Sequence, residues 1–369
     1  MKCEWEKYGL GSLMTFKNGK KRPEIGTLFP VYGGNGILGY ADKWNNENCV
    51  IVGRVGAYCG SVFREKGKCW ISDNAISGIS DDNSVDYLYY LLKSLRLNER
   101  HIGTSQPLLT QEILNNIQVS IPHCATQQKI ASILASFDDK IELNAQINHN
   151  LEEQIEAVFE DLFINSPQID HWEQGTIANL GKVIGGSTPS KAKPEYYTFD
   201  GIAWITPKVL SSTKTKFISK GELDITPLGL KNSSAVIMPR GTVLFSSRAP
   251  IGYIAIAKSE VTTNQGFKSV VPYQHIGTAF VYCFLKHNLS KIESMASGST
   301  FKEVSGSVMK AIPAIIPDSK TLAQFSTLTQ PLFEQQELLE AENQELTQLR
   351  DTLLPKLMSG EIDVSQVEV

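Results

Sequence analysis

Between Ile130 and Leu162, residues that are apolar at all but two positions recur at alternating spacings of four and three residues. This heptad spacing is typical of a long helix with one apolar stripe, and a helix from Thr126 to Leu162 is about 55 Å long. Such a stripe needs a partner that covers it. The predicted seam positions are Ile130, Leu134, Phe137, Ile141, Asn144, Asn148, Leu151, Ile155, Val158 and Leu162.

The same register returns 195 residues later, after Thr321-x-x-Gln324, which predicts a capping box. With no third long helix in the sequence, we predict that the two helices pair as an antiparallel coiled coil. Asn148 and Asn343 occupy the same slot, where a polar residue usually fixes register; a generic helix hairpin with incidental Asn is the alternative. The second set of seam positions is Phe325, Thr329, Leu332, Gln336, Leu339, Asn343, Leu346, Arg350, Leu353 and Leu357.

The repeat extends beyond the helices. Trp5 and Trp172 each open a half, and residues 117–122 align with residues 312–317 at the same offset of 195. Each helix follows a segment with β-rich stretches such as Cys49–Val52 and Ala235–Met238. We therefore predict an α+β fold with two tandem globular domains, each followed by a long helix. The predicted segments are domain 1 at 1–125, helix 1 at 126–165, domain 2 at 166–320, and helix 2 with the C-terminal tail at 321–369.

The net charge of −4 by itself argues against a nucleic-acid partner. The charge counted segment by segment gives a different result. Residues 1–125 hold 14 Lys and Arg against 12 Asp and Glu, and residues 166–320 hold 17 against 10. The acidic excess lies in residues 126–165, with 2 against 8, and in residues 321–369, with 2 against 9. Because polyanions respond to local potential, the two predicted domains can still present basic surfaces to DNA.

The sequence contains no phosphate loop: Gly19-Lys20, Gly67-Lys68 and Gly181-Lys182 lack the Ser or Thr that would follow. The Gly-rich stretches at 33–36 and 185–187 are better explained by turns than by a cofactor site. The six cysteines form no C-x-x-C pair and the six histidines have no close helical spacing, so we expect reduced thiols and no metal site. We predict no catalytic residue and no cofactor in this chain.

The N-terminus has no signal-like apolar run and no stretch of about 18 apolar residues occurs, so we expect a cytoplasmic chain with no membrane partner.

Several motifs resemble the target-recognition domains of type I restriction-modification specificity subunits. The second half contains residues 236–253, from Val236-Ile237-Met238-Pro239-Arg240 to Gly252-Tyr253, and Asn264-Gln265-Gly266-Phe267-Lys268. The first half contains sister versions at 31–40, 51–58 and 73–75, and residues 349–362 are similar to the closing segment of the family. The resemblance covers nearly the whole chain.

The resemblance implies a non-catalytic subunit that reads double-stranded DNA. Each domain would read one half of an asymmetric bipartite target. The helix pair would set the spacing and help dock two methyltransferase subunits, which the motor-nuclease restriction subunits would join. S-adenosylmethionine, ATP and Mg²⁺ would bind to those partner subunits.

The candidate DNA-contacting residues are chosen by side-chain chemistry alone. Cations can contact phosphates, and amide, aromatic and guanidinium groups can contact base edges. Solvated loops and internal hydrogen bonds are the alternative roles, above all for Arg54 and Arg248. The candidates in the first half are Lys17, Lys20, Lys21, Arg22, Tyr32, Asn35, Tyr40, Arg54 and Thr104. Those in the second half are Lys191, Lys193, Tyr196, Lys208, Lys214, Lys216, Arg240, Arg248, Asn264, Gln265 and Lys302.

Two other functions remain open at this point. The same two-domain reader could serve a related restriction system or act as a DNA-binding regulator. A coiled-coil scaffold with protein-binding heads is a third interpretation, disfavoured by the basic second domain.

Overall fold

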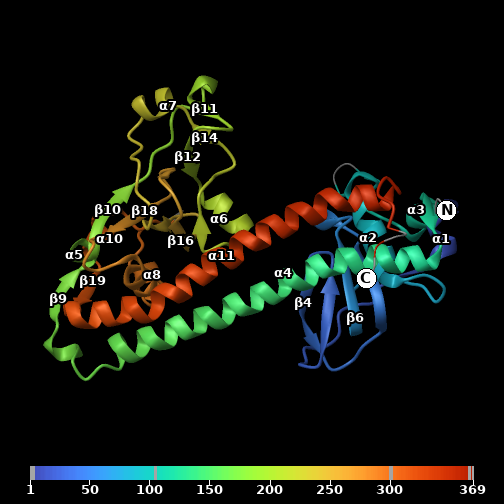
Figure 1. Ribbon diagram of the computed structural model, residues 1–369, viewed down its shortest axis with the longest axis horizontal. Helices are drawn as coiled ribbons and strands as arrows, with labels where there is room; N and C mark the ends of the chain where they lie inside the picture. The colour runs from blue at the N-terminus through green and yellow to red at the C-terminus, as the bar shows by residue number, and fades with distance from the viewer. Residues whose placement is uncertain (1–4, 104–105, 299–301, 365–366, 368–369) are drawn as a thin grey trace. The chain divides into compact units, whose positions relative to one another are not determined.

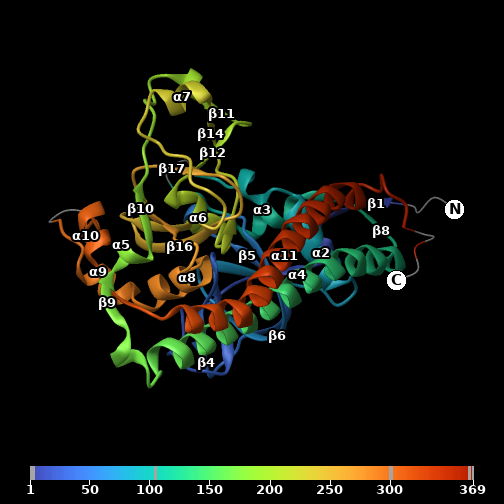
Figure 2. The ribbon, with the colours of Figure 1, turned by 60° about the vertical axis from the view of Figure 1, so that its left-hand side comes forward.

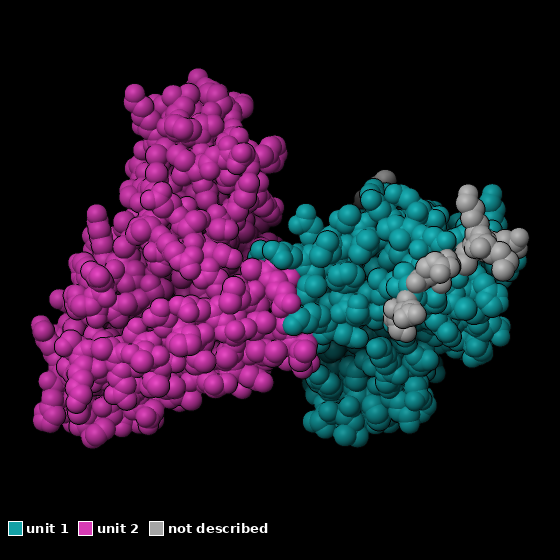
Figure 3. Space-filling view, in the orientation of Figure 1, with its two compact units in different colours: residues 1–142, 343–369 teal, residues 143–342 magenta. Residues whose placement is uncertain are grey.

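The computed structural model describes residues 5–103, 106–298, 302–364 and 367. The chain divides into two compact units, residues 1–142 with 343–369 and residues 143–342 (Figure 3). Each unit combines a globular domain of strands and short helices with part of α4 (Cys124–Phe159) and part of α11 (Ser319–Met358). The predicted fold class is confirmed. The division falls within both long helices.

The first unit is built on a six-stranded sheet in the order β2-β7-β5-β6-β3-β4. The central strand β5 is buried from Cys49 to Gly53, as its run of β-branched residues suggests. α2 begins after Ser84, whose Oγ accepts a hydrogen bond from the backbone N–H of Tyr87. The elements are β1 (Trp5–Gly9), α1 (Leu10–Leu13), β2 (Thr15–Asn18), β3 (Phe29–Gly33), β4 (Gly36–Ala41), β5 (Asn46–Gly53), η1 (Gly56–Tyr58), β6 (Val62–Ile71), β7 (Ala75–Ile79), α2 (Val85–Ser94), η2 (Leu97–Glu99), α3 (Gln111–Asn116) and β8 (Gln118–Pro122).

The second unit has a five-stranded sheet, β10-β18-β15-β16-β13, and a four-stranded sheet, β11-β14-β12-β17 (Figure 1). The elements after α4 are η3 (Glu160–Ile164), η4 (Ile169–His171), β9 (Glu173–Thr176), α5 (Ile177–Leu180), β10 (Gly181–Gly185), η5 (Pro194–Tyr196), β11 (Tyr197–Thr198), β12 (Ile202–Ile205), α6 (Pro207–Thr213), β13 (Phe217–Ile218), β14 (Asp224–Ile225), α7 (Pro227–Lys231), β15 (Val243–Ser247), β16 (Ile251–Ala257), β17 (Thr262–Thr263), β18 (Lys268–Pro272), α8 (Thr278–His287), α9 (Leu289–Ser294), α10 (Gly306–Ala311) and β19 (Pro313–Ile316).

The two domains share an order of elements at their edges. In the first, β1 pairs with β8 and leads through α1 into β2; in the second, β9 pairs with β19 and leads through α5 into β10. A helix capped by a side chain precedes β8 and β19 alike: Thr110 caps α3 and Ser305 caps α10. The repeat seen in the sequence therefore corresponds to a repeated structural frame.

One predicted strand is wrong. Residues 235–238 form no strand, and only Met238 makes an isolated bridge, to Val261. Val236 and Ile237 are exposed, so the apolar run that suggested a strand does not enter the core.

Within each unit, the parts of α4 and α11 that belong to it lie side by side and run in opposite directions (Figure 1), and Figure 2 shows the same pairing from another angle. In the first unit Asn343 Nδ2 donates to the carbonyl of Ile141 at 3.2 Å. In the second unit Gln336 Nε2 donates to the carbonyl of Asn148 at 3.0 Å. These two contacts join equivalent positions of the repeat, because Ile141 and Asn148 lie 195 residues before Gln336 and Asn343.

The seam is more polar than the heptad pattern suggested. Asn144, Thr329 and Gln336 are almost fully buried, whereas Leu332 and Leu151 are only half-buried. A polar side chain at such a position must be hydrogen-bonded, which restricts the helices to registers that supply a partner. Of the other predicted seam residues, Ile130, Leu134, Phe325 and Leu339 are buried, and Phe137, Ile141, Asn148, Asn343, Leu346 and Leu353 are half-buried.

The start of α11 differs from the predicted capping box. Asp318 precedes the helix, and its Oδ1 accepts hydrogen bonds from the backbone N–H groups of Lys320 and Thr321, both at 2.9 Å. The hydroxyl of Thr321 donates to Asp318 Oδ2 instead of capping the helix itself. Asp318 therefore caps the helix, and hydrogen bonds from Thr321 hold the pKa of its carboxyl at about 2.

Candidate nucleic-acid interface

The basic segment of the first domain lies along the edge strand β4. Arg22 Nη2 donates to the carbonyl of Leu38 at 2.7 Å, and the backbone N–H of Gly26 donates to the carbonyl of Tyr40 at 2.9 Å. These contacts bring residues 20–26 beside the β3–β4 hairpin. Lys20 and Lys21 are exposed and belong to this segment, whereas exposed Lys17 lies on β2, at the edge of the six-stranded sheet opposite β4 in the strand order.

The β3–β4 hairpin offers two exposed candidates and one buried one. Asn35 lies in the two-residue turn between Gly33 and Gly36, and Tyr40 is 49% exposed. Tyr32 is buried, its hydroxyl donates to Glu65 Oε2 at 3.0 Å, and burial raises its pKa. The ring of Tyr32 belongs to the core, so its prediction as a base-contacting group is corrected.

Arg54 follows β5 and is half-buried; its backbone carbonyl accepts from Leu109 at 2.9 Å. Its Nε atom is buried and meets no hydrogen-bond partner in the part of the chain that the structure describes. Thr104 lies outside the described residues, as do Ser299, Thr300 and Phe301 of the corresponding loop in the second half.

In the second domain the exposed candidates lie mainly between β10 and β13. Lys191 and Lys193 precede η5, Lys208 lies on α6, and Lys214 follows that helix. Lys193 and Lys208 each form an ion pair with a nearby carboxylate, Glu195 at 3.7 Å and Glu222 at 2.9 Å. These surface pairs contribute little to stability, so the ammonium groups can exchange their carboxylate for a phosphate at small cost.

Several of the remaining candidates of the second domain have structural contacts. Arg240 pairs with Glu337 of α11 at 2.7 Å, and Arg248 lies 3.5 Å from Glu303, which also binds Lys268. Asn264 Oδ1 accepts from the N–H of Gly266 and shapes a turn. Tyr196 is half-buried, Gln265 is exposed and hydrogen-bonded to Thr188, and Lys302 is exposed.

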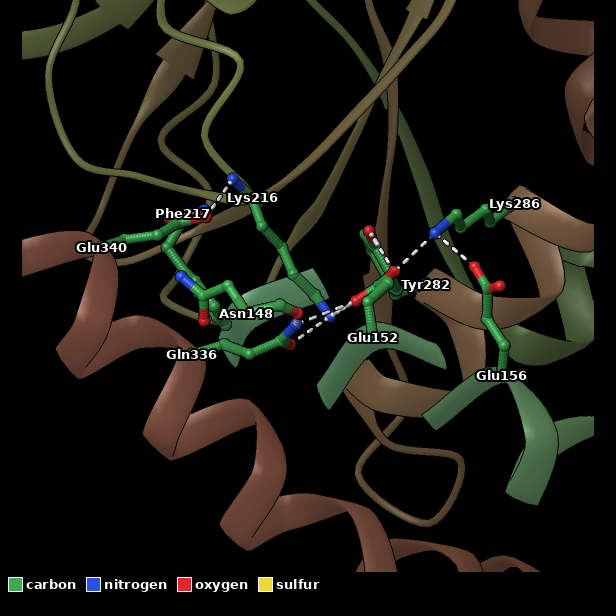
Figure 4. Close-up of polar contacts among 9 residues, drawn as sticks. All are labelled: Asn148, Glu152, Glu156, Lys216, Phe217, Tyr282, Lys286, Gln336 and Glu340. Atoms are coloured by element: carbon green, nitrogen blue, oxygen red, sulfur yellow. Dashed lines mark hydrogen bonds and ion pairs between the residues drawn. The ribbon is translucent and has the colours of Figure 1, made fainter. Parts of the chain in front are cut away.

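Lys216 is a clear correction. Its side chain is buried, and its ammonium lies 2.7 Å from Glu152 Oε2 of α4 and 2.8 Å from Gln336 Oε1 of α11 (Figure 4). A lysine held by a buried carboxylate and amide has no donor directed at solvent. The structure therefore assigns Lys216 to the interior and not to a DNA-facing surface.

Glu152 is the centre of this buried network. Its Oε1 accepts from the hydroxyl of Tyr282 at 3.1 Å and from Lys286 at 2.6 Å, while its Oε2 accepts from Lys216 and Gln336 (Figure 4). Burial alone would raise the pKa of Glu152, but the ammonium groups of Lys216 and Lys286 lower it to about 2. Glu152 is thus a carboxylate at neutral pH.

The backbone beside Lys216 is held as firmly as its side chain. The N–H groups of Lys216 and Phe217 donate to the two carboxylate oxygens of Glu340 at 2.8 and 3.0 Å. Glu340 lies on α11, and burial raises its pKa. Sequence reasoning missed Glu152, Tyr282, Lys286 and Glu340; the one available signal was the polar residue Gln336 at a seam position.

The described residues contain no group of three or more His, Cys, Asp or Glu side chains that could hold a metal ion. Within the same residues, no helix is both long and apolar enough to cross a membrane.

Comparisons with known proteins bear on the whole chain. The profile of a family described as "Type I restriction modification DNA specificity domain" matches residues 2–153 and 169–348. The specificity subunit of the type I restriction enzyme MjaIX from Methanocaldococcus jannaschii is 39% identical over 178 residues, which are 46% of this chain and 41% of that protein.

A second relative matches over a longer region. The specificity subunit of the type I restriction enzyme HindI from Haemophilus influenzae is 26% identical over 357 residues, 75% of this chain and 77% of that protein. Among solved structures, the crystal structure of a type I restriction-modification S subunit from M. genitalium has a TM-score of 0.63 at 19% identity and covers 96% of both chains. That likeness concerns the fold.

Proposed function

Because the chain belongs to the family of type I restriction-modification DNA specificity subunits, we propose that each of its two domains reads one half of a bipartite double-stranded DNA target. The observation that carries this proposal is the repeated frame: two domains with the same framing elements, each packed on parts of the same two helices. Two similar readers suit two half-sites, and their different loop sequences suit different bases, so the target is asymmetric.

The exposed cations support contact with the phosphate backbone. Lys20 and Lys21 lie in the segment beside the β3–β4 hairpin, Lys17 lies on β2, and Lys191, Lys193, Lys208 and Lys214 lie on the second domain. Phosphate contacts position a protein on DNA, whereas base contacts specify the sequence. Asn35 and Tyr40 are exposed on the β3–β4 hairpin, and Gln265 is exposed in the second domain, which suits groove contacts.

The chemistry belongs to partner subunits. Methyl transfer would be carried out by two methyltransferase subunits docked on the helix pair, with S-adenosylmethionine bound there, and DNA cleavage by motor-nuclease subunits that use ATP and Mg²⁺. The family membership supports this division of labour, as does the absence from the sequence of a phosphate loop. We further propose that the assembled complex acts in the cytoplasm.

The test is to co-express this chain with a type I methyltransferase subunit from the same host and to map methylated bases across the host genome by long-read sequencing. We expect one bipartite motif with a fixed gap that disappears when this chain alone is deleted. A stable complex that methylates no motif, or methylation that persists without this chain, would contradict the proposal.

A further inference from the structure

The second domain meets α4 and α11 mainly through an aromatic core. Phe159 of α4 packs against Phe280 of α8 with ring centroids 5.9 Å apart and against Phe325 of α11 at 6.0 Å. Such contacts stabilise association, but they are non-directional. A shift of one residue along a helix moves a side chain by about 1.5 Å and turns it by roughly 100°, and an apolar surface alone discriminates poorly between neighbouring registers.

Lys216 supplies the directional contact that the aromatic core lacks. One ammonium group touches α4 through Glu152 and α11 through Gln336, and Gln336 in turn donates to Glu152 Oε2 and to the carbonyl of Asn148. The position of the domain and the register of the two helices therefore depend on the same few atoms (Figure 4). A shift of any one of the three elements breaks hydrogen bonds to the other two.

The aromatic rings around the Lys216 ammonium make the loss of its contact with Glu152 costly. The ammonium of Lys216 lies 3.7 Å from the centre of the Phe333 ring and 4.3 Å from that of Tyr282, so aromatic faces fill the space that water would otherwise occupy. A buried ammonium that loses its carboxylate is strongly unfavourable, because neither water nor another anion replaces it. Glu340 adds a second point of attachment at the backbone of residues 216 and 217.

The first unit contains a smaller arrangement of the same kind. The hydroxyl of Tyr90 on α2 donates to Asp138 Oδ2 of α4 at 2.6 Å, and Asp138 forms an ion pair with Arg350 of α11. In each unit, then, a carboxylate of α4 joins a tyrosine of the globular domain and a polar side chain of α11.

We propose that Lys216 is a positioning residue that sets the gap between the two half-sites by locking the second domain, α4 and α11 into one register. This inference rests on the proposed function. Lys216 does not read a base; it determines where the reading surface of the second domain is held along the helices.

The test uses the complex with the methyltransferase and compares the wild type with Lys216→Met. In this variant Glu152 keeps Lys286 and Tyr282, so no unpaired carboxylate is created. We expect both half-sites to be retained and methylation to spread to gaps one base pair longer or shorter. The preference for the original gap should fall by about tenfold, the ratio that corresponds to losing one hydrogen bond to a charged group.

Two further variants make the result specific. Gln336→Leu leaves the Lys216–Glu152 ion pair and the Glu340 contacts in place and removes only the hydrogen bonds of the Gln336 side chain. It should relax the gap as well, which keeps the test valid where Lys216→Met fails to assemble. Lys182→Met removes an exposed lysine of β10 in the same domain and should leave the gap unchanged. Reduced methylation at a single unchanged gap in Lys216→Met or Gln336→Leu would mean a merely structural role and would overturn the proposal.

A distance measurement separates this inference from the proposed function. Spin labels on exposed Gln154 of α4 and Lys231 of α7, attached through a non-canonical amino acid, report the placement of the domain in the free chain. Lys216→Met and Gln336→Leu should broaden the distance distribution, and Lys182→Met should not. A broadened distribution together with a wild-type complex that recognises no motif would refute DNA reading but support the positioning role of Lys216. An unchanged distribution would refute that positioning role.

Discussion

Nζ of Lys216 lies 2.7 Å from Oε2 of Glu152, although 64 residues separate the two along the chain. The pair joins the start of β13 to α4, and Gln336 extends it to α11. A largely buried pair of this kind owes its strength to complete pairing, because each member has little access to water when its partner is removed.

Replacement of Glu152 by Gln should destabilise the chain in a pH-dependent manner. The pKa of Glu152 is about 2 in the folded chain against 4.5 for an unperturbed glutamate, so its carboxylate contributes stability above pH 4.5 and loses it as the pH falls towards 2. The difference in the free energy of unfolding between wild type and Glu152→Gln should be about 3 kcal/mol at pH 7 and shrink between pH 4.5 and 2. Urea unfolding at several pH values measures it.

The matched control is Glu153→Gln, the neighbouring exposed residue on α4, whose carboxylate lies 3.4 Å from His149. Its effect on the free energy of unfolding should be small. A destabilisation by Glu152→Gln that stays constant from about pH 7 to about pH 3 would contradict the assigned pairing.

Removal of the cap of α11 should also destabilise the chain. Asp318→Ala deletes the acceptor for two backbone N–H groups and for Trp172 Nε1, which donates at 2.9 Å. We expect a loss of about 1–2 kcal/mol, measured by thermal unfolding. Thr321→Ala removes one hydroxyl contact to Asp318 and should cost less; if it cost as much as Asp318→Ala, the capping box expected from the sequence would be the better description.

The exposed lysines should act on DNA affinity without regard to sequence. Lys191→Ala with Lys193→Ala should weaken binding by the methyltransferase complex to specific and unrelated DNA alike. The slope of log K against log salt should decrease by about 1 for each phosphate that the variant no longer neutralises. Fluorescence anisotropy over a range of salt concentrations measures this slope; Lys182→Ala is the control, and an unchanged slope in the double variant would exclude these lysines from the interface.

The long helices and the repeat were predictable because their signals are local or periodic. Heptad spacing from Ile130 onwards depends only on neighbours three and four residues away, and the repeat needs only a comparison of the chain with itself. The segment at Ala235–Met238 shows the limit of such patterns: an apolar run predicts a strand only where a sheet edge is available to it, and here the chain makes a single bridge.

The candidate site was less predictable for a physical reason. A lysine is equally suited to a phosphate and to a buried carboxylate, and the choice depends on residues far away in sequence. The partners of Lys216 lie 64 and 120 residues from it, and Tyr32 is joined to Glu65 across 33 residues. Composition and spacing identify the chemistry of such side chains but not the side of the protein on which they lie.

If the helix pair sets the gap, shortening both helices by one heptad should shorten the gap. Deletion of residues 140–146 together with residues 341–347 removes contacting pairs such as Ile141 with Asn343, and keeps Glu152, Gln336, Asp138 and Arg350. Seven residues correspond to about 10 Å of helix and almost two full turns, so the faces stay aligned and the gap should shrink by about 3 base pairs. Methylome mapping should find the same half-sites at the shorter gap. Deletion of 140–146 alone breaks the antiparallel register and should abolish methylation, and an active double deletion with the original gap would refute the idea that the helices measure the distance.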